Sequence, residues 1–169
     1  VAGDFGYSTA QIFGSMIDIS QPSYLLELRP DYLPDAPDQG VFSYLEGDSE
    51  ALIGKTFAVG SVAHELDAAA CRKNADATEN KIENALIMLL GLLTYQRGLP
   101  SQRLCLKLLT CLQKVTPELK SRVVDKLRGK HQIKYGSKTL TVEVAPLGCA
   151  DEGIGVLAVT PSVSVDQDV

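Results

Sequence analysis

The chain has 169 residues, enough for one domain with a core of its own, and its 45% hydrophobic and 22% charged residues are ordinary for a globular protein. A net charge of −5 argues against nonspecific binding of nucleic acid or anionic lipid by the surface as a whole. The four cysteines match no zinc-site or Cys-x-x-Cys spacing, so we expect free thiols in a cytoplasmic protein.

The start of the chain has the pattern of short β-strands. Gly3–Gly14 predicts a tight hairpin with Asp4 at its entrance and a return strand at Ala10–Phe13. We expect Asp18–Pro22 to connect this hairpin to Ser23–Leu28, the third strand of an antiparallel meander.

A stretch rich in Pro, Asp and Gly separates the meander from two further strand candidates. Three prolines between Arg29 and Gly40 exclude regular structure there. Val41–Leu45 and Lys55–Val59 are short strand candidates with a polar turn between them. We therefore expect residues 29–55 to form a loop-rich insertion.

Two helices are predicted in the middle of the chain. Val62–Cys71 has helical character, and Ser61 is placed to cap its N-terminus. Asp76 and Glu79 form a capping box for a second helix, which extends to about Gln96. The apolar side chains of this second helix share one broad face, which predicts burial against a sheet: Ile82, Ala85, Leu86, Leu89, Leu90 and Leu93.

One strand and one helix are predicted next. Arg103–Leu112 is bounded by prolines and alternates imperfectly, so a buried strand is favoured over a helix. Thr116 followed by Pro117 marks a helix start, and Arg128–Gly129 marks its end.

A hairpin, a connection and an apolar segment follow. Gln132–Tyr135 and Lys138–Val144 have period-two apolar faces on either side of a Gly-Ser turn. Pro146–Gly153 is expected to be a connection, and Ile154–Val159 is either a strand or the start of a buried helix. Strands, a helix pair and further strands predict a mixed α/β or α+β layer architecture.

Two places carry candidate chemistry. In the first, backbone N–H groups of the turn at Gly6–Thr9 would cradle a phosphate, and Asp4 would hold Mg²⁺ through water. An ordinary hairpin is the alternative, because short glycine motifs are weak signals. In the second, Glu152 within Asp151–Gly155 would orient a water for attack on a terminal phosphate. A solvated loop acid or a helix-start acid is the alternative there.

Other kinds of site lack their signatures. The sequence has no P-loop, no complete dinucleotide fingerprint and no Gly-x-Ser-x-Gly elbow. His64 and His131 are far apart in the sequence, which disfavours a metal role for either. Basic residues gather in 102–138, where a solvated helix face is the simpler interpretation and contact with a partner the alternative. No signal-peptide pattern is present, and Ile82–Leu93 is too short to span a membrane.

Five segments occur in an order typical of one family. Asp4–Thr9 has the form of a first phosphate loop, and Phe57–Ala63 that of a Val-Gly-x-x-Ala step from strand to helix. The helix at 78–96 follows, then a Leu-x-Gly-x-His hairpin in Leu127–Lys138, then the acidic, glycine-containing Asp151–Gly155. In these segments the chain resembles the N-terminal half of the prokaryotic actin-like ATPases, especially the plasmid-segregation branch of ParM or StbA type.

The resemblance implies a ribonuclease H-like lobe, the fold that actins share with sugar kinases and heat-shock chaperones. It also implies an ATPase that forms filaments and moves or positions DNA through an adaptor protein, with ATP and Mg²⁺ bound between this lobe and a second one. Asp4 would lie on the metal side, and Glu152 would position the attacking water. The phosphates would be contacted by backbone or hydroxyl groups of Gly6, Tyr7, Ser8 and Thr9.

The chain also departs from that family. Gln11 stands where a lysine is common, and Pro146 lies six residues before Glu152 instead of beside it. Because no second phosphate loop occurs, we expect residues 1–160 to be the N-terminal lobe, 161–169 to be a tail or linker, and the isolated chain to bind ATP poorly. The alternatives are a non-catalytic interaction or assembly module that keeps this lobe, and an unrelated α+β domain.

Overall fold

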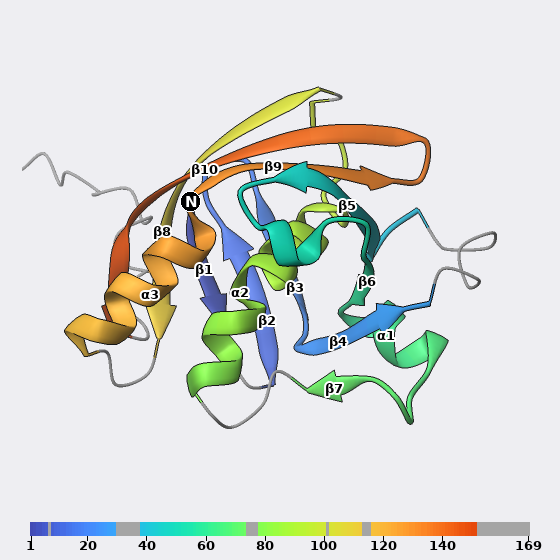
Figure 1. Ribbon diagram of the computed structural model, residues 1–169, viewed down its shortest axis with the longest axis horizontal. Coiled ribbons are helices and arrows are strands. Elements are labelled where there is room, and N and C mark those ends of the chain that lie inside the picture. The colour runs from blue at the N-terminus through green and yellow to red at the C-terminus, as the bar shows by residue number, and fades with distance from the viewer. Residues whose placement is uncertain (7, 30–37, 74–77, 101, 113–115, 152–169) are drawn as a thin grey trace, which may run out of the picture.

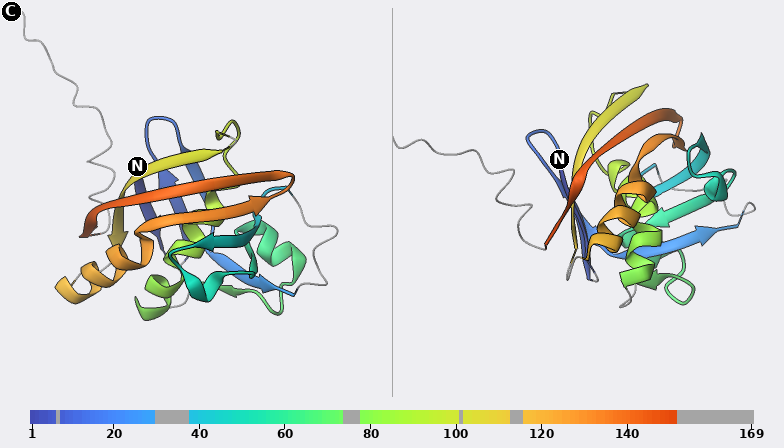
Figure 2. Two further views of the ribbon diagram at one scale, coloured as in Figure 1. Left: turned by 45° about the horizontal axis from the view of Figure 1, so that its top comes forward. Right: turned by 60° about the vertical axis from the view of Figure 1, so that its left-hand side comes forward.

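A computed structural model describes residues 1–6, 8–29, 38–73, 78–100, 102–112 and 116–151 of the chain. The strands arch around a central helix (Figures 1 and 2). In chain order the elements are β1 (Ala2–Phe5), β2 (Thr9–Phe13), β3 (Asp18–Pro22), β4 (Tyr24–Leu28), β5 (Val41–Gly47), the 3₁₀ helix η2 (Glu50–Leu52), β6 (Thr56–Val59), α1 (Ser61–Leu66), β7 (Arg72–Lys73), α2 (Thr78–Leu93), β8 (Arg103–Leu112), α3 (Pro117–Leu127), β9 (Gly129–Tyr135) and β10 (Lys138–Asp151).

Within the described residues, the strands form one sheet in the order β3-β2-β1-β8-β10-β9-β5-β6-β4-β7. The pairs β1–β8 and β8–β10 are parallel, whereas the flanking hairpins are antiparallel. The parallel strands need crossover connections, which the chain makes through the segments that contain α2 and α3. The predicted mixed α/β architecture is confirmed.

Helix α2 forms the centre of the core. Its side chains are buried on nearly every side from Ile82 to Leu93, as expected of a helix enclosed by other elements. It packs on β1, β2, β3, β5 and β6, and α3 packs on both α2 and β10. Complete burial of each leucine stabilises the fold by about 1.5–3 kcal/mol, so this one helix supplies a large share of the apolar burial.

A smaller core lies on the opposite face of the sheet. Strand β4 alternates, so that Leu25 faces the main core while Leu26 and Leu28 face α1. Ala58 of β6 and Ala63 of α1 complete this second cluster. Strand β6 is therefore covered on both faces, by α2 on one and α1 on the other.

The predicted three-stranded meander is present, but the prediction of which segment forms its third strand was wrong. Asp18–Pro22, expected to be a connection, forms β3 and pairs with β2. Tyr24–Leu28 forms β4, which pairs with β6 and β7. The error has a simple cause: β3 buries Ile19 but exposes Asp18 and Ser20, so its apolar pattern is weak.

Helix boundaries differ from the expected ones. Helix α1 is capped by Gly60 and not by Ser61, whose hydroxyl donates to Gln21 instead. It ends at Leu66 and not at Cys71, because Asp67 is extended and its carboxylate accepts from the next N–H groups along the chain. Helix α2 ends at Leu93 and is followed by three 3₁₀-type bonds that reach Gln96.

The strand predictions at 41–45, 55–59 and 103–112 are confirmed by β5, β6 and β8. Strand β5 lies between β9 and β6, so residues 41–47 belong to the sheet although they fall in the range expected to be an insertion. The Thr116 cap is confirmed, since its side chain accepts from the N–H of Leu119. None of the described helices is long and apolar enough to cross a membrane.

The prediction of a connection at Pro146–Gly153 was wrong for residues 146–151, which the structure describes. The strand continues as β10 to Asp151, paired with β8 along its length, and the register shifts between Pro146 and Gly148. Proline cannot donate to a ladder, and a bulge at this point accommodates it. Asp76, the cap residue of the predicted capping box, and the segment Ile154–Val159 lie outside the described part.

The Leu127–His131 motif takes part in a buried hydrogen-bonded contact between β5 and β9. His131 is 1% exposed, and its Nδ1 lies 2.8 Å from the Tyr44 hydroxyl, which accepts from the N–H of Ser49. Tyr44 therefore donates to Nδ1, and Nε2–H of His131 faces the Leu127 carbonyl, as in a neutral imidazole. A side chain at Gly129 would collide with the Asp48 carboxylate, which accepts from the N–H of Lys130 at 2.8 Å.

Replacing Gly91 by alanine should destabilise the protein although alanine favours helices. A Cβ at Gly91 would lie 2.2 Å from the nearer Val59 methyl carbon, and Val59 is fully buried. Overpacking typically costs about 1–3 kcal/mol, against about 1 kcal/mol gained in helix propensity. Urea unfolding should show a net loss for Gly91→Ala, partly recovered in the double variant with Val59→Ala. Additive effects of the two changes would contradict this close packing.

Acid should destabilise the protein through His131. Burial lowers the pKa of His131, and the nearby Asp48 carboxylate opposes this only in part. The unfolded chain then binds more protons than the folded one, so stability is full above about pH 6.5, the ordinary pKa of histidine, and falls as the pH drops below it. Thermal melts between pH 8 and 5.5 should show this slope, and His131→Asn should flatten it. His64→Asn is the matched control because His64 is exposed; an equal slope in all three proteins would contradict the assignment.

Candidate functional site

The carboxyl ends of the three parallel strands meet at one edge of the sheet. Asp4 on β1 is in register with Cys111 on β8, and Cys111 with Ala150 on β10. Asp151 then ends β10 beside Leu112, the last residue of β8 (Figure 1). In open α/β sheets, ligands bind outside the carboxyl ends of parallel strands. The pairing therefore brings the start and the end of the described chain to an edge of the kind that holds ligands.

The turn between β1 and β2 lies at this edge and depends on glycine. A Cβ at Gly6 would come within 2.9 Å of the Thr9 carbonyl oxygen, closer than real Cβ contacts. The same position would lie 3.6 Å from Oδ1 of Asp4, so the carboxylate sits directly against the turn. Asp4 is half-buried, and Ser8 is exposed. The turn thus combines a carboxylate, a close backbone and an accessible hydroxyl.

Gln11 is the residue directly across the hairpin from Asp4. Opposed residues of an antiparallel pair point to the same face, with Cβ atoms about 4.5–5.5 Å apart. Position 11 is therefore a neighbour of the candidate metal-side acid, and in this chain it presents a neutral amide.

Ser23 fastens this turn from the junction of β3 and β4. It is 2% exposed, and its hydroxyl donates to the Gly6 carbonyl at 2.6 Å. Its backbone N–H donates to the Ser8 carbonyl at 3.1 Å. The sequence placed Ser23 only as a strand residue; the one available signal was its position after Pro22, where a strand pattern breaks.

The site residues predicted from the sequence divide into two groups. Asp4, Gly6, Ser8 and Thr9 lie together at the β1–β2 turn. Tyr7 and Glu152 lie outside the described residues. Asp151, which precedes Glu152 in the sequence, ends β10 at the same edge as Asp4.

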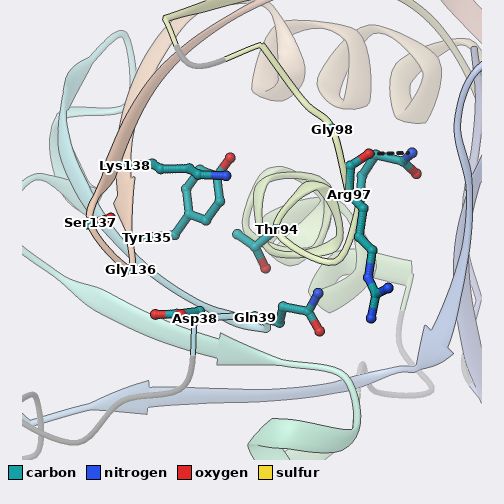
Figure 3. Close-up of a pocket in the computed structure, with 10 residues that line it drawn as sticks. Asp38, Gln39, Thr94, Arg97, Gly98, Tyr135, Gly136, Ser137 and Lys138 are labelled. Atoms are coloured by element: carbon teal, nitrogen blue, oxygen red, sulfur yellow. Dashed lines mark hydrogen bonds between the residues drawn. The ribbon is translucent and has the colours of Figure 1, made fainter.

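A cavity of about 250 Å³ lies away from this edge, between the β9–β10 turn and the end of α2 (Figure 3). Tyr135 and Thr94 point into it, and Asp38, Arg97 and Lys138 are among the residues that line it. Lys138 begins β10 and Asp151 ends it, so this cavity and the candidate site are at opposite ends of a 14-residue strand.

A second cavity, of about 470 Å³, lies between η2, α2 and α3. Ion pairs join Glu83 in its wall to Arg122 and Lys126 of α3, at 3.9 and 2.7 Å. Neither cavity contains Asp4 or Thr9.

Three of the basic residues between 102 and 138 form ion pairs within the chain, on two different elements. Arg122 and Lys126 pair with α2, whereas Arg103 on β8 pairs with Glu143 on β10. The Arg103 guanidinium holds the pKa of the exposed Glu143 carboxyl below its usual range. These pairs join neighbouring elements of this chain, which weakens the interpretation of 102–138 as a single binding stripe.

Comparison of the sequence with protein-family models and with curated proteins gave no match. Solved structures do match. The actin-like protein Alp7A superposes with a TM-score of 0.64 at 17% identity, over 89% of this chain and 44% of that one. The ParM protein of pSK41 in its apo form gives 0.63 at 11% identity, over 89% and 47%. The AlfA filament bound to AMPPNP gives 0.54 at 17% identity, over 92% and 55%.

These matches extend over nearly all of this chain but only about half of each relative. At such low identity the likeness shows the fold and not a shared activity. The chain therefore has the fold of about half of an actin-like protein of the ParM, Alp7A and AlfA kind.

Proposed function

We propose that the chain is the N-terminal, nucleotide-binding lobe of an actin-like filament protein that acts in plasmid or DNA segregation or in cytoskeletal positioning. One observation carries the proposal: the turn holding Asp4 and the end of β10 lie at the same edge of the sheet. That edge is where an α/β sheet of this kind binds a ligand. The solved relatives include ParM of Bacillus thuringiensis with AMPPNP, ATP and ADP.

The residues at the turn suit ATP and Mg²⁺. Glycine at position 6 lets the backbone of the turn close tightly against the Thr9 carbonyl, main-chain N–H groups of such a turn would serve as donors to a phosphate, and Ser8 and Thr9 add hydroxyl groups. Asp4 supplies a carboxylate of the kind that would hold Mg²⁺ through water. Among the described residues, no group of three or more His, Cys, Asp and Glu gathers as a metal site, so the phosphates and waters would complete the coordination.

In the proposed role, Mg-ATP would supply the phosphoanhydride and the counter-charge. Gly6, Tyr7, Ser8 and Thr9 would hold the β- and γ-phosphates, Asp4 would hold the hydrated metal, and Glu152 would orient the attacking water. Such positioning and electrostatic stabilisation account for most of the catalysis of phosphoryl transfer. Since the chain spans about half the length of its relatives, turnover requires a second lobe to enclose the nucleotide.

The same chain would associate with itself and reach DNA through an adaptor protein. Self-association is supported by the fold it shares with AlfA, whose structure is a filament. The net charge of −5 favours contact with DNA through an adaptor over direct binding.

A non-catalytic assembly module with the same lobe is the second candidate. It is favoured by Gln11, which places a neutral amide beside Asp4, where a cation would help to hold the phosphates. The two candidates differ in whether nucleotide controls assembly.

Asp4→Asn should weaken Mg-ATP binding by about tenfold or more in the full chain that carries this lobe, because it removes a charged metal ligand and little volume. Calorimetric titration with ATP, with and without Mg²⁺, should also show that the variant loses the gain in affinity due to Mg²⁺. Asp18→Asn, at an exposed position on β3, is the matched control and should bind as the wild type does. Unchanged affinity in Asp4→Asn would exclude Asp4 from the site.

Sedimentation of the full-length protein that carries this lobe should distinguish the two candidate functions. A nucleotide-controlled filament should pellet with Mg-ATP or AMPPNP and stay in the supernatant with ADP. A passive assembly module should give the same pellet in all three conditions. The latter result would overturn the proposal of an ATP-dependent filament.

A further inference from the structure

We infer that Ser23 is a positioning residue for the phosphate-binding turn, holding its carbonyl groups away from the bound anion. This inference rests on the proposed nucleotide-binding function. Ser23 is the single residue between β3 and β4, at the point where the chain leaves the β1–β2–β3 meander for the far part of the sheet. Ser23 is far from the β1–β2 turn in the sequence, so only the fold brings the two together.

Ser23 holds the turn at two points. Its hydroxyl donates to the Gly6 carbonyl at 2.6 Å, and its N–H donates to the Ser8 carbonyl at 3.1 Å. Any residue except proline can supply the second bond, but the first needs a hydroxyl. Ser23 is 2% exposed, so water does not readily replace a lost hydroxyl.

These bonds decide which atoms of the turn face a ligand. A phosphate is attracted by N–H groups and repelled by carbonyl oxygens. The C=O and N–H of one planar trans peptide group point in opposite directions. With the Ser8 carbonyl directed at Ser23, the N–H of Thr9 is directed away from Ser23. The two Ser23 hydrogen bonds thus fix the direction of the peptide groups in the turn before any nucleotide binds. Less conformational entropy is then lost when the nucleotide binds.

Ser23 is itself anchored on both sides. Two residues earlier, the Gln21 side chain accepts from the N–H and the hydroxyl of Ser61, both at 3.3 Å. One residue later, the Tyr24 carbonyl accepts from the N–H of Gly60 at 3.0 Å. Hydrogen bonds of its two neighbours therefore connect Ser23 to the β6–α1 junction. A movement of that junction would be transmitted through Ser23 to the turn.

The test compares Ser23→Ala with Ser23→Thr, which keeps the hydroxyl, and with Ser20→Ala, a serine-to-alanine control at an exposed position on β3. Ser23→Cys keeps the volume with a weak donor and is a second loss variant. Amide hydrogen exchange without nucleotide should rise about tenfold at residue 23, whose N–H donates to the Ser8 carbonyl, in the Ala and Cys variants, while α2 amides stay protected. Affinity for Mg-ATP in the full chain should fall about tenfold in those variants and stay near the wild-type value in Ser23→Thr and Ser20→Ala.

The outcomes separate the two hypotheses. If the wild-type protein binds no Mg-ATP, the proposed function fails, and the role of Ser23 fails with it. If the wild type binds and the Ala and Cys variants bind equally well, the inference about Ser23 alone is overturned. Equal loss of protection at residue 23 and in α2 would make Ser23 a general stability residue and would also overturn it. Faster exchange at residue 23 but not in α2, together with weaker ATP binding, supports it.

Discussion

The parallel pairing of β1 with β8 and of β8 with β10 is the constraint on which the rest of the structure depends. It sets the amino-terminal hairpin beside the end of the long strand β10, although the two are far apart in the sequence. It also requires two crossover segments, and these carry the helices that cover the concave face of the sheet. Without this pairing, Asp4 would be the acid of an isolated hairpin. With it, Asp4 lies at an edge to which Asp151 also belongs.

Close packing at a few points holds this arrangement in place. Helix α2 passes over β6 where Gly91 meets Val59, and no larger residue than glycine fits between them as they stand. The Tyr44–His131 pair and the Asp48 carboxylate join β5 to the start of β9. Thus Gly129 and His131, which contribute to the family resemblance in the sequence, serve the fold, whereas Gly6 serves the turn. Residues of one motif set need not share one role.

Much of the fold follows from the sequence, because strongly periodic segments decide their own structure. The leucine-rich helix α2 was predictable for that reason, the start of α3 was predictable from its Thr-Pro cap, and β5, β6 and β8 were predictable as short apolar runs between turn or proline signals. Three features were not. Strand β3 has a single strong apolar residue on its buried face, β10 runs through a proline by means of a bulge, and Asp67 ends α1 by a local side-chain bond. The first two depend on partner strands that no local pattern contains, whereas the end of α1 is set by the bonds from the N–H groups of Ala69 and Ala70 to Asp67. At the site, the acid and the glycine turn were predictable, but Ser23 was not, since the hydrogen bond of its hydroxyl spans 17 residues of sequence.

The proposed nucleotide site is a half-site: one edge of a sheet, with the β1–β2 turn and the Asp4 carboxylate beside it. The most direct test of this account is an amide NMR titration with Mg-ATP. The account predicts chemical-shift changes at Asp4, Gly6, Ser8, Thr9 and Asp151, with Gly136 and Ser137 at the distant cavity unaffected. Changes centred on Gly136 and Ser137, with none at the β1–β2 turn, would contradict it.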